Sequence, residues 1–345
     1  MQIDFPIDLH ICDDLALDRC ALEKLHKLLS VKFVLITGSS VSLAYAQNLL
    51  SNISAEPSLV FSGFLNTVDY SYVVDSEIRK NVPEVILAIG GGSVADFAKR
   101  VAYISGKKLI LLPTIIANDG LISPIAVLRE SGSSVSLPGK MPDHVFIDLV
   151  SLKQAPKKYI RAAACDLLSN ISATSDWEYA ADKGSERLNN LAFHFSRMAA
   201  YNILDCKSWD HNSPEFFRSV LHGQVMSAMA MAYAGSSRPC SGSEHLIAHA
   251  MDALQLTNDM LHGEVVGRAT LFSLYLQGHE FNDVKRLLKM LSVPHKLLNY
   301  PISQEVLMNI FEKCRSVRPG RKTVLDEFTE VELVGKYREF ENLEG

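Results

Sequence analysis

The stretch Glu84–Thr114, EVILAIGGGSVADFAKRVAYISGKKLILLPT, decides the fold of the first half of the chain. Val85–Ile89 is a short apolar run rich in β-branched residues, which is typical of a buried strand in a parallel sheet. Three glycines follow at once, then a helical pattern of apolar residues, and then a second apolar run at Leu109–Leu112. This order of strand, glycine turn, helix and strand predicts one βαβ unit.

The glycine turn Gly90–Gly92 suits a phosphate group. Residues without a Cβ let the backbone approach an anion, and the N–H groups and dipole of the following helix attract it. We expect Ser93 to cap this helix, with Asp96 as the acid of a capping box. The alternative is that a tight turn before a helix uses glycines for its geometry alone. The motif is not G-x-G-x-x-G and does not follow the first strand, so an ordinary Rossmann domain is not the best match.

The rest of the first half alternates strands and helices in the same way, which predicts an α/β domain with a parallel sheet. The predicted strands are Lys32–Ile36, Ser58–Gly63, a hairpin of Ala126–Leu128 with Ser133–Leu137, and His144–Leu149. The predicted helices are Asp14–Leu29, one ending near Leu50, and Tyr70–Asn81. The turn Thr37–Ser40 carries no acid to bind a ribose 2′-hydroxyl, so NADP should be accepted as well as NAD.

Apolar residues at helical spacing run through the second half, where strand patterns disappear. The predicted helices are Lys157–Asp182, Leu188–Asp205, Phe216–Tyr233, Glu244–Leu254, Glu264–His279 and Asn282–Leu291. We therefore expect an α/β domain over residues 1–150 and an all-helical domain over residues 151–345.

The bulk properties exclude several classes of protein. A chain of 345 residues is long enough for two domains, and its net charge of −5 argues against a general nucleic-acid or membrane-surface binder. No apolar run approaches the ~18 residues that span a membrane, and the N-terminus carries acids where a secretion signal carries lysines. The six cysteines contain no C-x-x-C pair, which favours free thiols. We expect a cytoplasmic protein.

The helical half carries a second chemical pattern. Ser241 and Glu244 have the spacing of a capping box, which places His245 and His249 on one face of the helix that follows. His262 lies where another helix begins. A single histidine on a helix is more often an ordinary core or surface residue. Three of them at helix starts favour a functional site.

Asp166 adds a carboxylate, because it lies inside an otherwise apolar helix. Two imidazoles and one carboxylate make a three-ligand metal site with a position open for substrate. The H-E-x-x-H metalloprotease pattern fails, since Leu246 stands where that chemistry needs its glutamate. Asp119, in a loop after a predicted strand, is either a site residue or the turn residue of Asn-Asp-Gly.

Taken together and in order, these motifs resemble a known family, the glycerol-1-phosphate dehydrogenases of the iron-containing alcohol dehydrogenase and dehydroquinate synthase superfamily. The motifs are Gly90-Gly91-Gly92-Ser93-Val94-x-Asp96, Pro113-Thr114, Asn118-Asp119-Gly120-x-x-Ser123-Pro124, Asp166 with Ser169-Asn170, Ser237-Arg238-Pro239-x-Ser241-Gly242-x-Glu244-His245-x-x-x-His249, His262-Gly263-Glu264 and Arg318-Pro319-Gly320-Arg321-x-Thr323. The resemblance covers nearly the whole chain.

The resemblance implies a dehydroquinate synthase-like fold, with a dinucleotide-binding first domain and a metal- and substrate-binding second domain. It implies interconversion of sn-glycerol 1-phosphate and dihydroxyacetone phosphate with NAD or NADP and one divalent metal, usually zinc, although iron or nickel also suit these ligands. It implies metal ligands Asp166, His245 and His262, and catalytic or substrate-binding roles for Asp119, Asp166 and His249. The implied cofactor contacts are Gly91, Gly92, Ser93, Val94, Ala95, Asp96, Thr114, Ile115, Ile116, Ala117 and Ser123. We also expect a homo-oligomer.

Three positions leave questions open at this stage. Cys165 stands where the family leads us to expect glycine, and Asn118 where histidine is frequent. Arg238 either pairs with a substrate phosphate or is a structural loop arginine. The rival functions are a glycerol or other polyol dehydrogenase of the same superfamily, a sugar-phosphate cyclase of the dehydroquinate synthase type, and a non-catalytic dinucleotide-binding protein.

Overall fold

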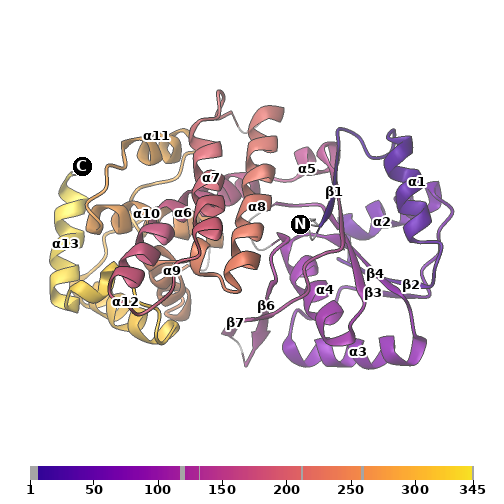
Figure 1. Cartoon of the computed structure of the whole chain (residues 1–345), viewed down its shortest axis with the longest axis horizontal. Coiled ribbons are helices and arrows are strands. Elements are labelled where there is room, and N and C mark those ends of the chain that lie inside the picture. Colours follow the sequence, from indigo (N-terminus) through magenta and orange to yellow (C-terminus); the bar gives the residue numbers. More distant parts are fainter. Residues whose placement is uncertain (1–6, 117–120, 132, 211–212, 258–259, 344–345) are drawn as a thin grey trace. The chain divides into compact units, whose positions relative to one another are not determined.

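The structure is a computed structural model, and it describes residues 7–116, 121–131, 133–210, 213–257 and 260–343 (Figure 1). The chain divides into two compact units whose boundary lies between Pro156 and Lys157. Among the described residues, no helix combines the length and the apolar character needed to cross a membrane.

The first unit is built on a six-stranded sheet in the order β1-β8-β5-β4-β2-β3, in which every neighbouring pair is parallel. The strands are β1 (Asp8–Cys12), β2 (Phe33–Thr37), β3 (Leu59–Ser62), β4 (Val85–Gly90), β5 (Lys108–Pro113) and β8 (His144–Asp148). The predicted α/β class and parallel sheet are confirmed. The edge strand β1 was not predicted.

Both faces of the central strands are covered, which explains why their sequences are continuously apolar. On one face, alternate residues of β2 and β4 such as Phe33, Leu35 and Leu87 lie in one apolar core with α1 (Arg19–Leu28) and α2 (Val41–Asn52). On β4 and β5, α4 (Gly92–Ser105) makes further contacts, and α3 (Val68–Asn81) packs on α4. A short helix, α5 (Leu149–Gln154), is the last element of this unit in the sequence.

The predicted cap of α4 is wrong. The helix begins after Gly91, and neither Ser93 nor any other side chain makes the capping hydrogen bond. Asp96 instead forms an ion pair with the fully buried Lys99, at 2.9 Å. Burial raises the pKa of Asp96, and the Lys99 charge acts in the opposite direction. The N–H groups at the start of α4 therefore have no side-chain cap.

A two-stranded antiparallel hairpin, β6 (Ile125–Glu130) with β7 (Ser133–Pro138), contacts α4. Its position agrees with the predicted hairpin. The hydroxyl of Ser123, which is 1% exposed, donates to the carbonyl of Ile125 at the start of this hairpin.

In the part of the second unit that the structure describes, every element is a helix, so the predicted helical half is confirmed (Figure 1). The α-helices are α6 (Lys158–Asp182), α7 (Asn190–Leu204), α8 (Pro214–Ala234), α9 (Ser243–Ala253), α10 (His262–Leu276), α11 (Asn282–Met290), α12 (Gln304–Val317) and α13 (Glu330–Leu343), with short 3-10 turns η2 (Arg238–Cys240) and η3 (Val324–Glu327). The last two α-helices were not predicted. The long α6 contacts α7, α8, α9 and α10, so it is the centre of this unit.

We expect the glycines of the β4–α4 turn to tolerate substitution unequally. A Cβ on Gly90 would lie 2.5 Å from Cγ2 of Val94, whereas a Cβ on Gly92 meets nothing within 4 Å. Gly90→Ala should therefore lower the free energy of unfolding by about 1–3 kcal/mol, the usual cost of overpacking. Gly92→Ala, the matched control, should change it by less than about 0.5 kcal/mol. Urea denaturation of both variants measures the difference, and equal stabilities would contradict this packing.

Candidate metal and substrate site

The second unit brings together the three side chains expected to bind metal. One ligand atom from each of Asp166, His245 and His262 lies within 4.8 Å of the other two. The Nε2 atom of His245 is 3.6 Å from Oδ1 of Asp166, and the rings of His245 and His262 are 5.4 Å apart. Asp166 and His245 are buried while His262 is exposed. Because two of the side chains are buried and the third is exposed, a metal ion or a small molecule can approach the group from the side of His262.

A close approach of two helices fixes Asp166 against His262. A Cβ on Gly263 would lie 2.1 Å from the carbonyl oxygen of Ala162 and 3.2 Å from Cβ of Asp166. One turn later, a Cβ on Gly267 would lie 2.7 Å from Cβ of Cys165. The absence of side chains at two positions of α10 therefore lets it lie directly on α6. The unexpected Cys165 is accommodated because Gly267 faces it.

His245 is oriented by its neighbour in sequence. Its Nδ1 atom is 2.9 Å from Oε1 of Glu244, which is fully buried. When Nδ1–H donates to that carboxylate, the lone pair of Nε2 is directed to Asp166, an arrangement common to metal-binding histidines. Burial lowers the pKa of His245 well below its usual value, and the charge of His262 adds to this effect. This direction favours the neutral imidazole, the form that binds a metal.

The predicted capping box at Ser241 and Glu244 is wrong, although a helix does begin there. Gly242, not Ser241, precedes α9, and it has no side chain that could cap the helix. The Ser243 N–H instead donates to Oδ2 of Asp176 at 2.6 Å, a carboxylate from α6. Oε1 of Glu244 accepts from the N–H of Gly242. Two buried carboxylates therefore satisfy the first N–H groups of the helix that carries His245.

His249 lies next to this group. Its ring is 5.4 Å from that of His262 and 6.0 Å from that of His245. Nη2 of Arg318 lies 3.0 Å from Nε2 of His249, so the guanidinium donates to that nitrogen. Burial lowers the pKa of His249 well below its usual value, with the charges of His262 and Arg318 contributing. The imidazole is neutral, with Nδ1–H as its remaining donor.

Of the two alternatives for Arg238, its contacts support the structural loop arginine. The side chain is 2% exposed, and Nη2 donates to the carbonyls of Asp176 and Lys322. Its Nε atom is 3.0 Å from Glu186. These partners leave Arg238 holding three chain segments together rather than reaching a substrate.

In the first unit, the expected cofactor contacts lie at the carboxyl ends of two neighbouring strands. Gly90 of β4 pairs with Pro113 of β5, and the Thr114 N–H donates to the carbonyl of Gly90 at 2.9 Å. A Cβ on Gly91 would lie 3.4 Å from Cδ1 of Ile115. The start of α4 and the segment after β5 therefore lie side by side at the carboxyl ends of the strands, where α/β proteins bind ligands.

The side chains of the expected cofactor contacts differ in access. Val94, Ala95 and Ile116 are buried, so only their backbone can meet a ligand. Ser123 is also buried, with its hydroxyl hydrogen-bonded inside its own loop. Ala117 and Asp119, together with Asn118, lie outside the described residues.

Asp176 was missed at the level of sequence, and Arg318 and Arg321 were named only as parts of a family motif, without a role. Asp176 follows Asp166 on the same apolar helix, and that context was the available signal. The two arginines lie in a loop after α12, and their partners Ser237 and Ser241 are distant in sequence. Their place in the motif Arg318-Pro319-Gly320-Arg321-x-Thr323 was the available signal, and it indicated neither partner.

Comparison with known proteins first gives the class of protein and its fold. Residues 18–156 match the family model of the iron-containing alcohol dehydrogenases. Among solved structures, a probable glycerol dehydrogenase from Sinorhizobium meliloti aligns with a TM-score of 0.75 and 19% identity over 98% of this chain and 97% of that one. Sulfoacetaldehyde reductase from Bifidobacterium kashiwanohense, in complex with NAD+, aligns with a TM-score of 0.74 and 16% identity over 98% of each chain. At these identities the structures show a common fold.

Sequence relatives narrow the class. A glycerol-1-phosphate dehydrogenase from Thermoplasma volcanium is 32% identical over 85% of this chain and 84% of the relative. One from Sulfurisphaera tokodaii is 31% identical over 94% and 93%, respectively. The chain belongs to the glycerol-1-phosphate dehydrogenase family.

The glycine contacts between α6 and α10 give a test of the site geometry. Gly263→Ala should push the helices apart, lower the free energy of unfolding by about 1–3 kcal/mol and reduce zinc bound by the purified protein. Gly335→Ala is the matched control, because Gly335 is also helical and a Cβ there meets nothing within 4 Å. Denaturation and metal analysis measure both effects. Normal zinc content in a destabilised Gly263→Ala protein would show that the contact does not position the ligands.

Proposed function

We propose that the protein is a metal-dependent, NAD(P)-linked dehydrogenase that interconverts sn-glycerol 1-phosphate and dihydroxyacetone phosphate. The observation that best supports this proposal is the group of Asp166, His245 and His262, found in a chain of the glycerol-1-phosphate dehydrogenase family. The residues fit a divalent cation because two imidazoles and a buried carboxylate converge, with Glu244 orienting one imidazole. The proposal includes the expected cytoplasmic location and homo-oligomeric state.

Each unit would supply one part of the reaction. The start of α4 and the segment after β5 would hold the dinucleotide, with the glycine turn and the N–H groups of the helix taking its phosphates. Asp166, His245 and His262 would hold the metal, with zinc as the first choice. When bound, such an ion acts as a Lewis acid toward the reacting oxygen. The exposed His262 leaves the group open to a substrate.

His249 would orient the substrate. Arg318 donates to Nε2 of His249, which fixes Nδ1–H as the donor that a substrate hydroxyl can meet. Because the pKa of His249 is lowered, its imidazole would act as a neutral hydrogen-bonding partner of the substrate rather than as an acid that stays protonated during turnover. Asp119, from the resemblance, remains the second proposed substrate contact.

Enzyme assays distinguish the proposed reaction from its rivals. With bound zinc, the protein should reduce dihydroxyacetone phosphate with NADH or NADPH and oxidise sn-glycerol 1-phosphate, with little activity on free glycerol. Cofactor absorbance at each substrate concentration measures this. Activity on glycerol alone would reject the phosphorylated substrate. Release of inorganic phosphate without net cofactor oxidation would indicate the cyclase, and no turnover with bound nucleotide would indicate a binding protein.

Removal of one ligand tests the metal site. His262→Ala should lose zinc and reduce kcat by about 100-fold or more, with little loss of stability because His262 is exposed. The matched control is His279→Ala, an exposed histidine just after the same helix. Asp119→Ala should retain zinc but raise KM or lower kcat. Full activity of metal-free His262→Ala, or loss of zinc from Asp119→Ala, would contradict these roles.

A further inference from the structure

We infer that Arg318 and Arg321, with the hydroxyls of Ser237 and Ser241, form the binding site for the phosphate group of the substrate. This inference rests on the proposed function and assigns to residues of the second unit the recognition of a phosphorylated rather than a free polyol.

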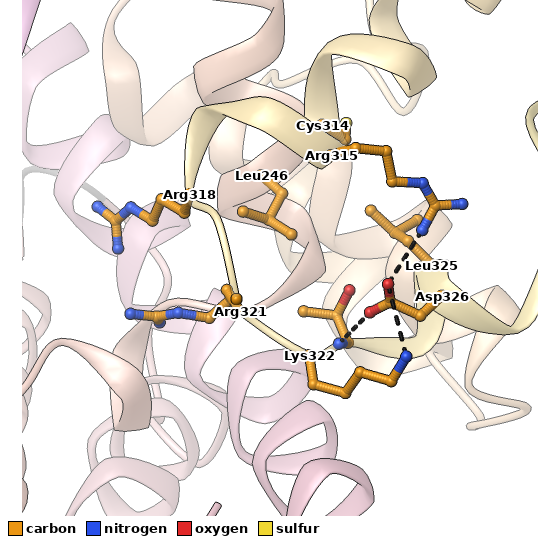
Figure 2. Close-up of a pocket in the computed structure, with 10 residues that line it drawn as sticks. Leu246, Cys314, Arg315, Arg318, Arg321, Lys322, Leu325 and Asp326 are labelled. Carbon is orange, nitrogen blue, oxygen red and sulfur yellow. Dashed lines mark hydrogen bonds and ion pairs between the residues drawn. The ribbon is translucent and has the colours of Figure 1, made fainter. Parts of the chain in front are cut away.

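The two guanidinium groups are directed to the same place. Figure 2 shows the side chains of Arg318 and Arg321 extending in the same direction, away from the pocket whose other side holds Arg315 and Asp326. Arg315 is engaged there by Asp326 and Glu330, each at 3.2 Å. Arg315, on α12, is therefore paired with acids, whereas Arg318 and Arg321, in the loop that follows, extend elsewhere, and Arg318 reaches His249.

Both guanidinium groups are held in place by neutral oxygens. Nη1 of Arg318 donates to the hydroxyls of Ser237 and Ser241, at 2.9 and 3.0 Å. Nη1 of Arg321 donates to the Ser241 carbonyl, and its Nη2 donates to the Ser237 hydroxyl at 3.3 Å. Because each serine hydroxyl accepts from an arginine, its own proton is available to donate to another acceptor. The four side chains therefore offer fixed donors around one position.

The electrostatics favour an anion at that position. The pKa of Arg321 is lowered to about 10, first by burial and then by the charges of Arg318 and Arg238, while Glu186 and Glu244 act in the opposite direction. Like charges with poor access to water are costly unless an opposite charge compensates them. Guanidinium groups match the oxygens of a phosphate in geometry and charge, so a phosphate dianion would relieve this cost.

The position also suits the length of the substrate. Arg318 reaches Nε2 of His249 at 3.0 Å, and the His249 ring is 5.4 Å from the ring of His262. A phosphate held by the arginines would therefore lie beside the group of Asp166, His245 and His262. In glycerol phosphate, a single carbon and an ester oxygen link the reacting carbon to the phosphorus, which matches this short separation.

The test compares Arg321→Met with Arg315→Met, which removes a neighbouring arginine that is paired with acids. In the zinc-loaded protein, Arg321→Met should raise KM for dihydroxyacetone phosphate by about 10- to 100-fold, the effect of losing a charge-assisted hydrogen bond. The variant should also bind inorganic phosphate more weakly by a similar factor. Calorimetry with saturating NAD(P)H measures this affinity. Zinc content and melting temperature should be retained. Arg315→Met should leave KM and phosphate affinity unchanged.

Different outcomes overturn different claims. If the wild-type enzyme reduces dihydroxyacetone phosphate but Arg321→Met leaves both KM and phosphate affinity unchanged, the assigned phosphate site is wrong and the proposed function stands. If the wild type turns over only free glycerol, the proposed function fails, and phosphate binding that depends on Arg321 would still establish the anion site. If Arg321→Met loses zinc or unfolds, Arg321→Lys decides. Unchanged phosphate affinity in that folded variant counts against a guanidinium-specific site.

Discussion

The buried carboxylate of Asp176 is the interaction on which the second unit depends. One oxygen accepts from the N–H of Ser243 at the start of α9, and the other accepts from the N–H of Val324 at 2.7 Å. Burial raises the pKa of Asp176 to about 6, with the nearby Glu244 as the next cause. A buried anion of this kind persists only because its hydrogen bonds are satisfied. Those bonds join α6 to α9 and to the segment that follows the phosphate-site arginines.

The positions of the proposed metal ligands depend on this arrangement. Asp166 lies on the same helix as Asp176. His245 lies two residues after Ser243, whose N–H donates to Asp176. His262 is fixed separately, through the glycine contacts between α10 and α6. The three proposed ligands thus lie on α6, α9 and α10, and α6 contacts both of the other helices. Side chains positioned by packed helices hold a coordination geometry more precisely than side chains on loops.

The sequence predicts well those features that are determined locally. The βαβ unit and the helical second half follow from apolar periodicity, and the histidines follow from their spacing at helix starts. The short strand β1 was missed because it is only partly buried and pairs with β8, far along the chain. The two predicted capping boxes failed for different reasons. Gly91 precedes α4 without a cap, and the cap of α9 comes from a residue 67 positions earlier.

The paired arrangement of Cys165 and Gly267 has a consequence for how the family varies. With glycine at position 165, a Cβ at position 267 would have the Cα of residue 165 as its nearest backbone neighbour, at an ordinary 3.4 Å. With cysteine at position 165, the same Cβ would meet another Cβ at 2.7 Å. The helix pair therefore has room for one side chain at this crossing. Homologous chains should show compensatory covariation there, so that a bulkier residue on either helix is accompanied by a glycine on the other.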